Sequence, residues 1–245
     1  MINLIFVNES CQNSLFLDKI QKSKSVLKHI EGPKSEKVKR ERNISYSALV
    51  YLLRYFFDIS SPDINFIAKP YLVDKEQSVS FNISHTDGAI IIALSDEYPS
   101  VGVDIEKVMD AGIAKRINKR FLSSEEVFDM SAPLAEKVNF FSLCYEGGEP
   151  HLYKIPKNEE VKMDKLPKPH IPRLLKENQA LPKNGENDAY STTTRFTLLE
   201  SLLKCEGGGF SSISRWTEIK KDCECVSFWF SVSGREFSVS LSCMK

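Results

Sequence analysis

The stretch that most constrains the fold runs from Val101 to Glu106, where apolar and acidic residues alternate. Side chains alternate between the two faces of a β-strand, so Val103 and Ile105 are expected on the face opposite to the two acids. The fold must bury the apolar face. It must also relieve the repulsion between Asp104 and Glu106, which share a face. A hard divalent cation such as Mg²⁺, which prefers oxygen ligands, is one solution, and a solvated strand face is the other.

Helices and strands are expected in both halves of the chain, which predicts an α+β fold. Helices are expected at residues 15–29, 35–57, 113–121, 123–130, 134–143 and 196–205. Strands are expected at residues 1–7, 64–67, 79–88, 89–94, 101–106, 226–232 and 237–241. The last two strands are separated by Ser-Gly-Arg, which predicts a β-hairpin. The second half of the helix at 35–57 is apolar nearly all round, which indicates that it is buried.

Composition and charge exclude several classes of protein. The formal net charge is +0, so nothing in it suggests nucleic acid or a membrane surface as a partner. No apolar run reaches the ~18 residues of a membrane span. The first residues lack a basic region and a cleavage site, so no signal peptide is expected. None of the six cysteines forms a C-x-x-C pair, which is typical of a reducing compartment. We expect a cytoplasmic monomer.

The composition changes sharply after residue 144. Residues 145–195 contain six of the eleven prolines, many charges of both signs and little periodicity. This pattern predicts an extended or partly disordered insertion at about 144–195. We therefore expect an N-terminal subdomain at 1–100 and a C-terminal subdomain at 101–245, the second of which the insertion interrupts.

Several polar residues are candidates for binding an anion. Ser84 and His85 are adjacent on an expected strand and so point to opposite faces, which rules them out as a nucleophile and its base. With the nearby Lys69 they suit an anion instead, although His85 alone would equally well be a turn residue. The basic run that includes Arg42 begins the long helix. It would either form a solvated face or help to bind phosphates.

Three blocks of sequence, taken in order, resemble one family. They are Phe-Asn-Ile-Ser-His at 81–85, Gly-Val-Asp-Ile-Glu at 102–106 and Phe-Thr-Leu-Leu-Glu-Ser-Leu-Leu-Lys at 196–204. Lys69 with the following proline, and Lys-Arg-Phe-Leu-Ser at 119–123, fit further elements of the same pattern. The resemblance is to the 4′-phosphopantetheinyl transferases, in their surfactin-type, pseudodimeric branch, and it covers nearly the whole chain outside the expected insertion.

The resemblance implies two similar α/β subdomains related by a pseudo-twofold axis, with the active site at their interface. It implies transfer of phosphopantetheine from coenzyme A to a serine of an apo carrier protein, leaving adenosine 3′,5′-bisphosphate. The carrier could serve fatty-acid, polyketide or nonribosomal peptide synthesis. The residues that the resemblance assigns are Asp104, Glu106 and Glu200 for Mg²⁺, Asp104, Glu200 and Lys204 for catalysis, and Lys69, Ser84, His85 and Arg42 for the phosphates of coenzyme A.

The chain departs from the family pattern at two points that bear on activity. Leu199 stands where the family has a lysine, so one cation is missing beside the catalytic glutamate. Asp104 and Glu200 lie 96 positions apart, about twice the family's usual spacing. Removing residues 144–195 would join 140–143 to 196–200 in one helical pattern, so we expect the insertion to split a helix. One alternative function is a weakened homologue that binds coenzyme A or a carrier protein without efficient turnover. A further alternative is a metal-dependent phosphohydrolase that uses the same carboxylates.

Overall fold

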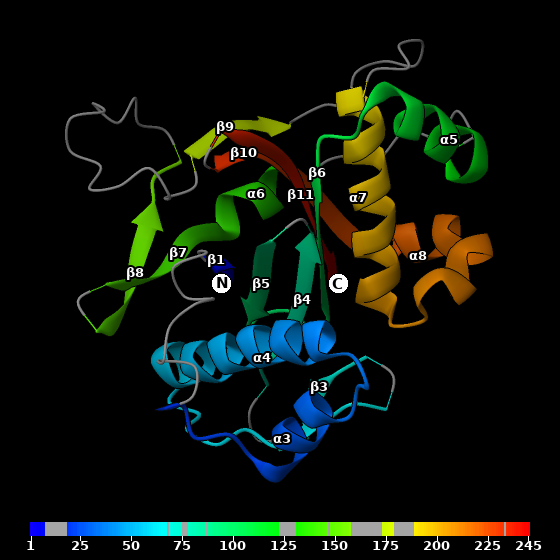
Figure 1. Cartoon of the computed structure of the whole chain (residues 1–245). Coiled ribbons are helices and arrows are strands. Elements are labelled where there is room, and N and C mark those ends of the chain that lie inside the picture. Colours follow the sequence, from blue (N-terminus) through cyan, green and yellow to red (C-terminus); the bar gives the residue numbers. More distant parts are fainter. Residues whose placement is uncertain are drawn as a thin grey trace, which may run out of the picture.

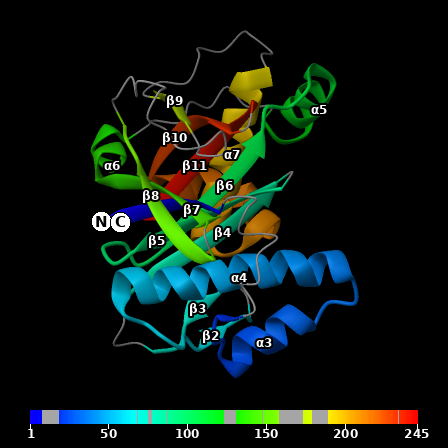
Figure 2. The same ribbon diagram turned by 60° about the vertical axis from the view of Figure 1, so that its left-hand side comes forward.

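The computed structural model describes residues 1–7, 19–67, 69–74, 78–86, 88–122, 131–146, 148–157, 173–178, 189–232 and 234–245. Within these residues the chain is a mixed α+β protein built around two main sheets. The two sheets pack against each other, and helices cover both outer sides (Figures 1 and 2). None of the helices in the described part of the chain is long and apolar enough to span a membrane.

The first sheet has five strands in the order β4-β5-β1-β7-β8. Their bounds are β1 (Ile2–Val7), β4 (Ser80–Thr86), β5 (Ala89–Ser95), β7 (Val138–Glu146) and β8 (Glu149–Ile155). All pairings are antiparallel except that of β1 with β7. Strands β7 and β8 follow residue 101, yet they belong to the sheet of the N-terminal strands. Sheet membership therefore crosses the expected boundary between subdomains.

Helix α4 (Glu36–Phe57) covers the outer face of this sheet, with α3 (Lys24–Glu31) beside it (Figure 1). Its apolar second half buries Leu49, Leu52 and Leu53 completely against that face. The helix ends where Asp58 adopts a left-handed conformation, with φ of 58°. A small hairpin of β2 (Ile64–Asn65) and β3 (Tyr71–Leu72) lies next to these helices.

The second sheet has four antiparallel strands in the order β6-β11-β10-β9. Their bounds are β6 (Val101–Lys107), β9 (Arg173–Asn178), β10 (Cys223–Val232) and β11 (Arg235–Met244). Its inner face meets the first sheet in a core that includes Phe6, Val103, Phe140, Phe228 and Phe230. Its outer face carries α7 (Ala189–Glu206), and α7 in turn packs against α5 (Ala111–Phe121), the 3₁₀ helix η2 (Gly209–Arg215) and α8 (Trp216–Lys221).

Most expected elements are present with small differences at their ends. The strand at 101–106, the helix at 35–57, the helix at 113–121 and the terminal hairpin are all confirmed. Of the helix expected at 15–29, residues 15–18 lie outside the described residues, and the observed helix begins at Lys24. The helix expected at 123–130 also lies outside them. The strand expected at 64–67 is shortened to two residues.

The prediction of a helix at 134–143 is wrong. Helix α6 (Ala132–Lys137) stops early, and Val138 begins strand β7. Phe140 enters the core between the sheets, whereas Leu143 faces α4, so the strand is apolar on both faces. A strand buried on both sides shows no alternation, and periodicity cannot separate it from a buried helix.

The same strand overturns the expected split helix, because residues 140–143 cannot continue into 196–200 as one helix. Parts of the stretch at 144–195 belong to regular elements: the end of β7, all of β8 and β9, and the first two turns of α7. Residues 147, 158–172 and 179–188 of that stretch lie outside the described residues.

Candidate active site

Strand β6 presents the two acids as its alternation predicts. Val103 and Ile105 are fully buried in the core between the sheets. Asp104 points to the opposite face, where only 2% of its side chain is exposed. That face is covered by α7, so Asp104 is a charged group in a closed environment. A buried carboxylate of this kind must be paired or bound to a cation.

Helix α7 brings Glu200 and Lys204 to this face. They lie four residues apart and therefore share one side of the helix. The Lys204 ammonium is 2.5 Å from Asp104 Oδ1 and 3.7 Å from Glu200 Oε2. The second and third sequence blocks thus meet in space, although 96 positions separate Asp104 from Glu200.

Gly102 makes this meeting possible. A Cβ atom at this position would stand 2.0 Å from the carbonyl oxygen of Ser201 and 2.4 Å from the backbone nitrogen of Cys205. Real side chains never come so close to backbone, so only glycine lets α7 lie directly on β6. The glycine that begins the Gly-Val-Asp-Ile-Glu block is therefore needed for the approach of the helix that carries Glu200.

Strand β4 approaches the acids from the other sheet. Ser84 is buried and donates a hydrogen bond to Asp104 Oδ1 at 2.8 Å, while it accepts one from Lys204 Nζ at 3.0 Å. Two residues further on, Thr86 donates to Glu106 Oε2 at 2.9 Å. The site therefore draws on three elements: β4, β6 and α7.

Burial and neighbouring negative charge change the acidity of Glu200. Burial of the side chain and the nearby charges of Asp104 and Glu106 raise the pKa of Glu200 to about 7, against the opposing effect of Lys204. The charged form of a carboxyl group is disfavoured by desolvation and by like charges, so both causes act in the same direction. Glu200 can therefore hold or release a proton near neutral pH.

The acids have the chemistry of a divalent cation site. In the described part of the chain, no three histidine, cysteine, aspartate or glutamate side chains are already arranged to coordinate a metal ion. Lys204 supplies the positive charge between Asp104 and Glu200 instead. However, Asp104 Oδ2 is buried and receives no hydrogen bond from any described donor. An unsatisfied carboxylate oxygen beside two further carboxyl groups fits a hard cation such as Mg²⁺.

Lys69 is held within the protein. Its ammonium donates to Ser100 Oγ, to the carbonyl oxygen of Val101 at 2.7 Å and to that of Cys205 at 3.0 Å. These bonds use all three of its protons and link the start of β6 to the end of α7. Burial lowers the pKa of Lys69. A phosphate would have to displace one of these bonds in order to reach it.

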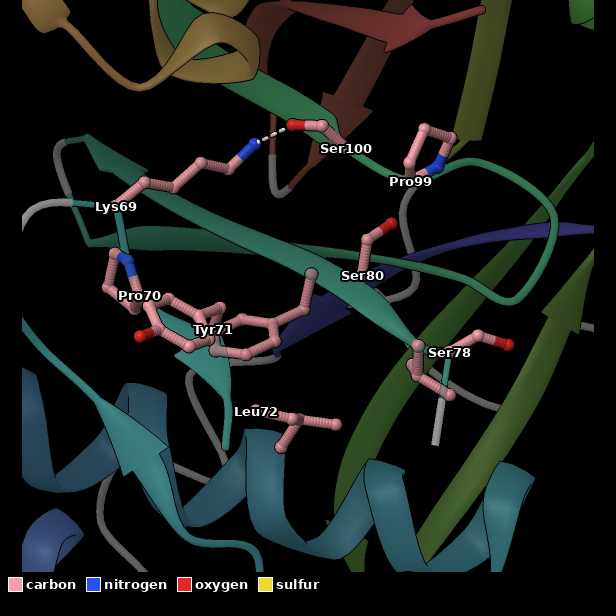
Figure 3. Close-up of a pocket in the computed structure, with 10 residues that line it drawn as sticks. Lys69, Pro70, Tyr71, Leu72, Ser78, Ser80, Pro99 and Ser100 are labelled. Carbon is pink, nitrogen blue, oxygen red and sulfur yellow. Dashed lines mark hydrogen bonds between the residues drawn. The ribbon is translucent and has the colours of Figure 1, made fainter. Parts of the chain in front are cut away.

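Lys69 also lines a pocket of about 300 Å³ between the β3 hairpin and the start of β4. Figure 3 shows this pocket, with the Lys69 side chain directed to Ser100 and away from Leu72. The remaining lining residues are Pro70, Tyr71, Ser78, Val79, Ser80, Phe81 and Pro99. The pocket contains none of the three acids of β6 and α7.

The other two candidates for phosphate binding lie apart from the acids. His85 points away from Ser84, as expected for neighbours on a strand. Its side chain is 58% exposed, and its Nε2 atom is 3.9 Å from Glu41 on α4. Arg42 donates to the carbonyl oxygen of His29 at 2.8 Å and so helps to close the end of α3.

Sequence reasoning missed Thr86 and the reason for Gly102. The signal for Thr86 was its position, since it lies two residues after Ser84 and so shares its face. The signal for Gly102 was a glycine inside a strand, which often marks close approach of another backbone. The structure also shows where the Leu199 side chain lies. It is 1% exposed and packs in an apolar cluster with Leu122, Phe196 and Leu203.

No family model matches the chain, and a search of curated proteins found no match. The likeness to phosphopantetheinyl transferases therefore rests on the sequence blocks.

Proposed function

We propose that this chain is a 4′-phosphopantetheinyl transferase of the surfactin-type branch, which moves phosphopantetheine from coenzyme A to a serine of an apo carrier protein. The observation that supports this most is the convergence of Asp104, Glu200 and Lys204. They come from two separate sequence blocks and meet at 2.5 Å and 3.7 Å. A chance resemblance of two short blocks gives no reason for their acids to share one site.

Phosphoryl transfer depends more on charge neutralisation and positioning than on covalent chemistry. Asp104, Glu106 and Glu200 would hold Mg²⁺, which when bound neutralises negative charge on the pyrophosphate of coenzyme A. Lys204 carries a positive charge at the same point and stabilises charge that develops on the transferred phosphate. His85 and Arg42 supply outlying positive or hydrogen-bonding groups for the remaining phosphates.

Glu200 suits the role of general base. Transfer requires that the attacking serine hydroxyl lose its proton, and a base is most useful when its pKa lies near the working pH. Before a cation binds, burial and the neighbouring acids raise the pKa of Glu200, so its ionised carboxylate accepts a proton more readily than an ordinary carboxylate. The proton passes from the serine oxygen to the Glu200 carboxylate as the serine oxygen binds phosphorus. The bond from that phosphorus to the bridging oxygen of the pyrophosphate breaks in the same step, and adenosine 3′,5′-bisphosphate leaves with the bridging oxygen.

The test is direct. The purified protein is incubated with Mg²⁺, coenzyme A and a panel of apo carriers from fatty-acid, polyketide and peptide synthesis, and each carrier is weighed by intact mass spectrometry. We expect one carrier at least to gain a single phosphopantetheine and adenosine 3′,5′-bisphosphate to appear in equal amount. No gain on any carrier would overturn transferase activity.

A second candidate is a protein that binds coenzyme A or a carrier without efficient turnover. The observation that favours it is Leu199, whose side chain lies in the apolar cluster and supplies no cation next to Glu200. Calorimetric titration of coenzyme A separates the two functions. Binding without turnover on any carrier supports this candidate, and rapid turnover excludes it.

A further inference from the structure

We infer that Ser84 and Thr86 are positioning residues that orient Asp104 and Glu106 for a divalent cation. The inference rests on the proposed function in so far as it takes those acids as cation ligands. It gives Ser84 a role different from the phosphate binding that the resemblance implies, and it adds Thr86, for which the resemblance implies none.

The first step is the relation between the two sheets. Strand β4 is an edge of the first sheet and β6 an edge of the second, and the described residues form no backbone ladder between them. Side chains make the link instead. Asn82 Oδ1 accepts from the backbone nitrogen of Val103 at 3.1 Å, and the hydroxyls of Ser84 and Thr86 donate to Asp104 and Glu106.

The second step is the match in spacing. Asn82, Ser84 and Thr86 follow one another at intervals of two, so they share one face of β4. The two acids are also two residues apart on β6. Each hydroxyl therefore meets its own carboxylate, at 2.8 Å for Ser84 and 2.9 Å for Thr86. One strand supplies one donor for each acid.

The third step is what a single donor does to a carboxylate. Ser84 has one hydroxyl proton and gives it to Oδ1 of Asp104, which also receives the Lys204 ammonium. The second oxygen, Oδ2, receives no described donor. The side chain is thus held with one oxygen satisfied and the other available to a cation. Thr86 restrains the longer Glu106 side chain in the same way. The branched Cβ of Thr86 limits rotation about its own χ1, which fixes the direction of the hydroxyl.

Hydrogen bonds that orient metal ligands commonly change metal affinity 10- to 100-fold when they are removed. We therefore expect Thr86→Val, which keeps the shape of the side chain, to weaken binding of Mn²⁺ by about tenfold. Thr86→Ser keeps the hydroxyl and should retain most of the wild-type affinity. Ser84→Ala should weaken binding by a similar factor.

Asn82 provides a matched control. It joins the same two strands, but its described hydrogen bond comes from the backbone nitrogen of Val103 and not from either acid. If the link only held the sheets together, Asn82→Ala would weaken Mn²⁺ binding as much as Thr86→Val. We expect Asn82→Ala to lower the melting temperature and to leave Mn²⁺ affinity unchanged.

The measurement is titration of each purified full-length variant with Mn²⁺ alone, followed by electron paramagnetic resonance of the free ion, with melting temperature recorded in parallel. Wild-type affinity in Thr86→Val, equal loss in Asn82→Ala, or no Mn²⁺ binding by the wild type each overturns the inference. If Thr86→Val and Ser84→Ala lose Mn²⁺ affinity, Asn82→Ala does not, and the protein modifies no carrier, the positioning roles are upheld and the transferase function is rejected.

Discussion

Gly102 of β6 and Ser201 of α7 stand so close that a Cβ on the glycine would lie 2.0 Å from the serine carbonyl oxygen. This contact sets the distance between the strand that carries Asp104 and the helix that carries Glu200 and Lys204. The candidate site therefore depends on the absence of one side chain.

Gly102→Ala should separate α7 from β6 or fail to fold stably. The added methyl group overlaps backbone atoms of Ser201 and Cys205, which cannot rotate away, so we expect a loss of about 3 kcal/mol or more in the free energy of unfolding. Chemical denaturation measures this loss, and the Mn²⁺ affinity should fall with it. Gly112→Ala is the control, because its added Cβ would meet only the Asp110 side chain, at 3.3 Å. Equal stability of the two variants would contradict the role given to Gly102.

Asp104→Asn should abolish transfer of phosphopantetheine. The change keeps the size of the side chain but removes the charge that pairs with Lys204 and that would help to hold the cation. We expect at least a hundredfold loss in rate, measured by intact mass of the carrier, because electrostatic groups at a reacting centre contribute about 3 kcal/mol or more. Asp58→Asn is the matched control. Asp58 follows the last residue of α4 and belongs to none of the three elements of the site, and asparagine tolerates its left-handed conformation. Full activity of Asp104→Asn would remove it from the site.

Leu199→Lys should destabilise the protein. Sequence alone suggests that this change restores the lysine of the family pattern and so keeps or raises activity. In the structure, however, Leu199 is 1% exposed within an apolar cluster, and a buried ammonium without a partner costs several kcal/mol. We expect a loss of about 3 kcal/mol or more in denaturant unfolding. Leu199→Met, which conserves volume, should lose less than about 1.5 kcal/mol. A stable and more active Leu199→Lys would show that this turn of α7 is arranged differently.

The stability of the protein should fall as the pH is lowered from about 6.5 to about 4, in part because of His29. Its ring stacks on Phe66 with centroids 3.9 Å apart, and burial together with the Arg42 charge lowers the pKa of His29 to about 4. The folded state thus prefers the neutral ring. This preference contributes stability above the ordinary pKa of about 6.5. The contribution is lost as the pH falls from about 6.5 to about 4, because the unfolded chain binds a proton there and the folded chain does not.

His29→Phe should therefore flatten this part of the pH profile, by about 1 kcal/mol, since the ring is only partly buried and water screens the effect. Denaturant unfolding at a series of pH values measures the slope. His151→Gln, at an exposed position, should leave the slope as in the wild type. A slope that persists in His29→Phe would assign it to other groups.

Local patterns in the sequence were sufficient for much of the secondary structure. The long helix at 36–57 follows from its apolar second half, and the terminal hairpin turns at Gly234, whose φ of 75° favours glycine. The strand that carries Asp104 follows from alternation. The pairing of Glu200 with Lys204 also follows, because four residues make about one helical turn. Each of these features depends on residues close together along the chain.

Where local patterns failed, burial was the reason. Strand β7 is apolar on both faces because α4 lies on one side and the second sheet on the other, and its sequence resembles a buried helix. Alternating serines on β11 are typical of an exposed face, yet Ser238, Ser240 and Ser242 are fully buried. Helix α7 covers them and bonds to them through hydroxyls, at 2.7 Å for both Thr197 with Ser240 and Ser201 with Ser242.

By itself the sequence identified the acids, the lysine and the chemistry that they suit. Only the tertiary structure decided which residues orient them. Ser84 meets Asp104, and Thr86 meets Glu106, because the edges of two sheets come together there, and Lys69 is drawn instead into bonds with the backbone. These contacts join residues about 20 to 136 positions apart. Such contacts are set by how whole sheets and helices pack, and no periodicity along a single strand or helix encodes that packing.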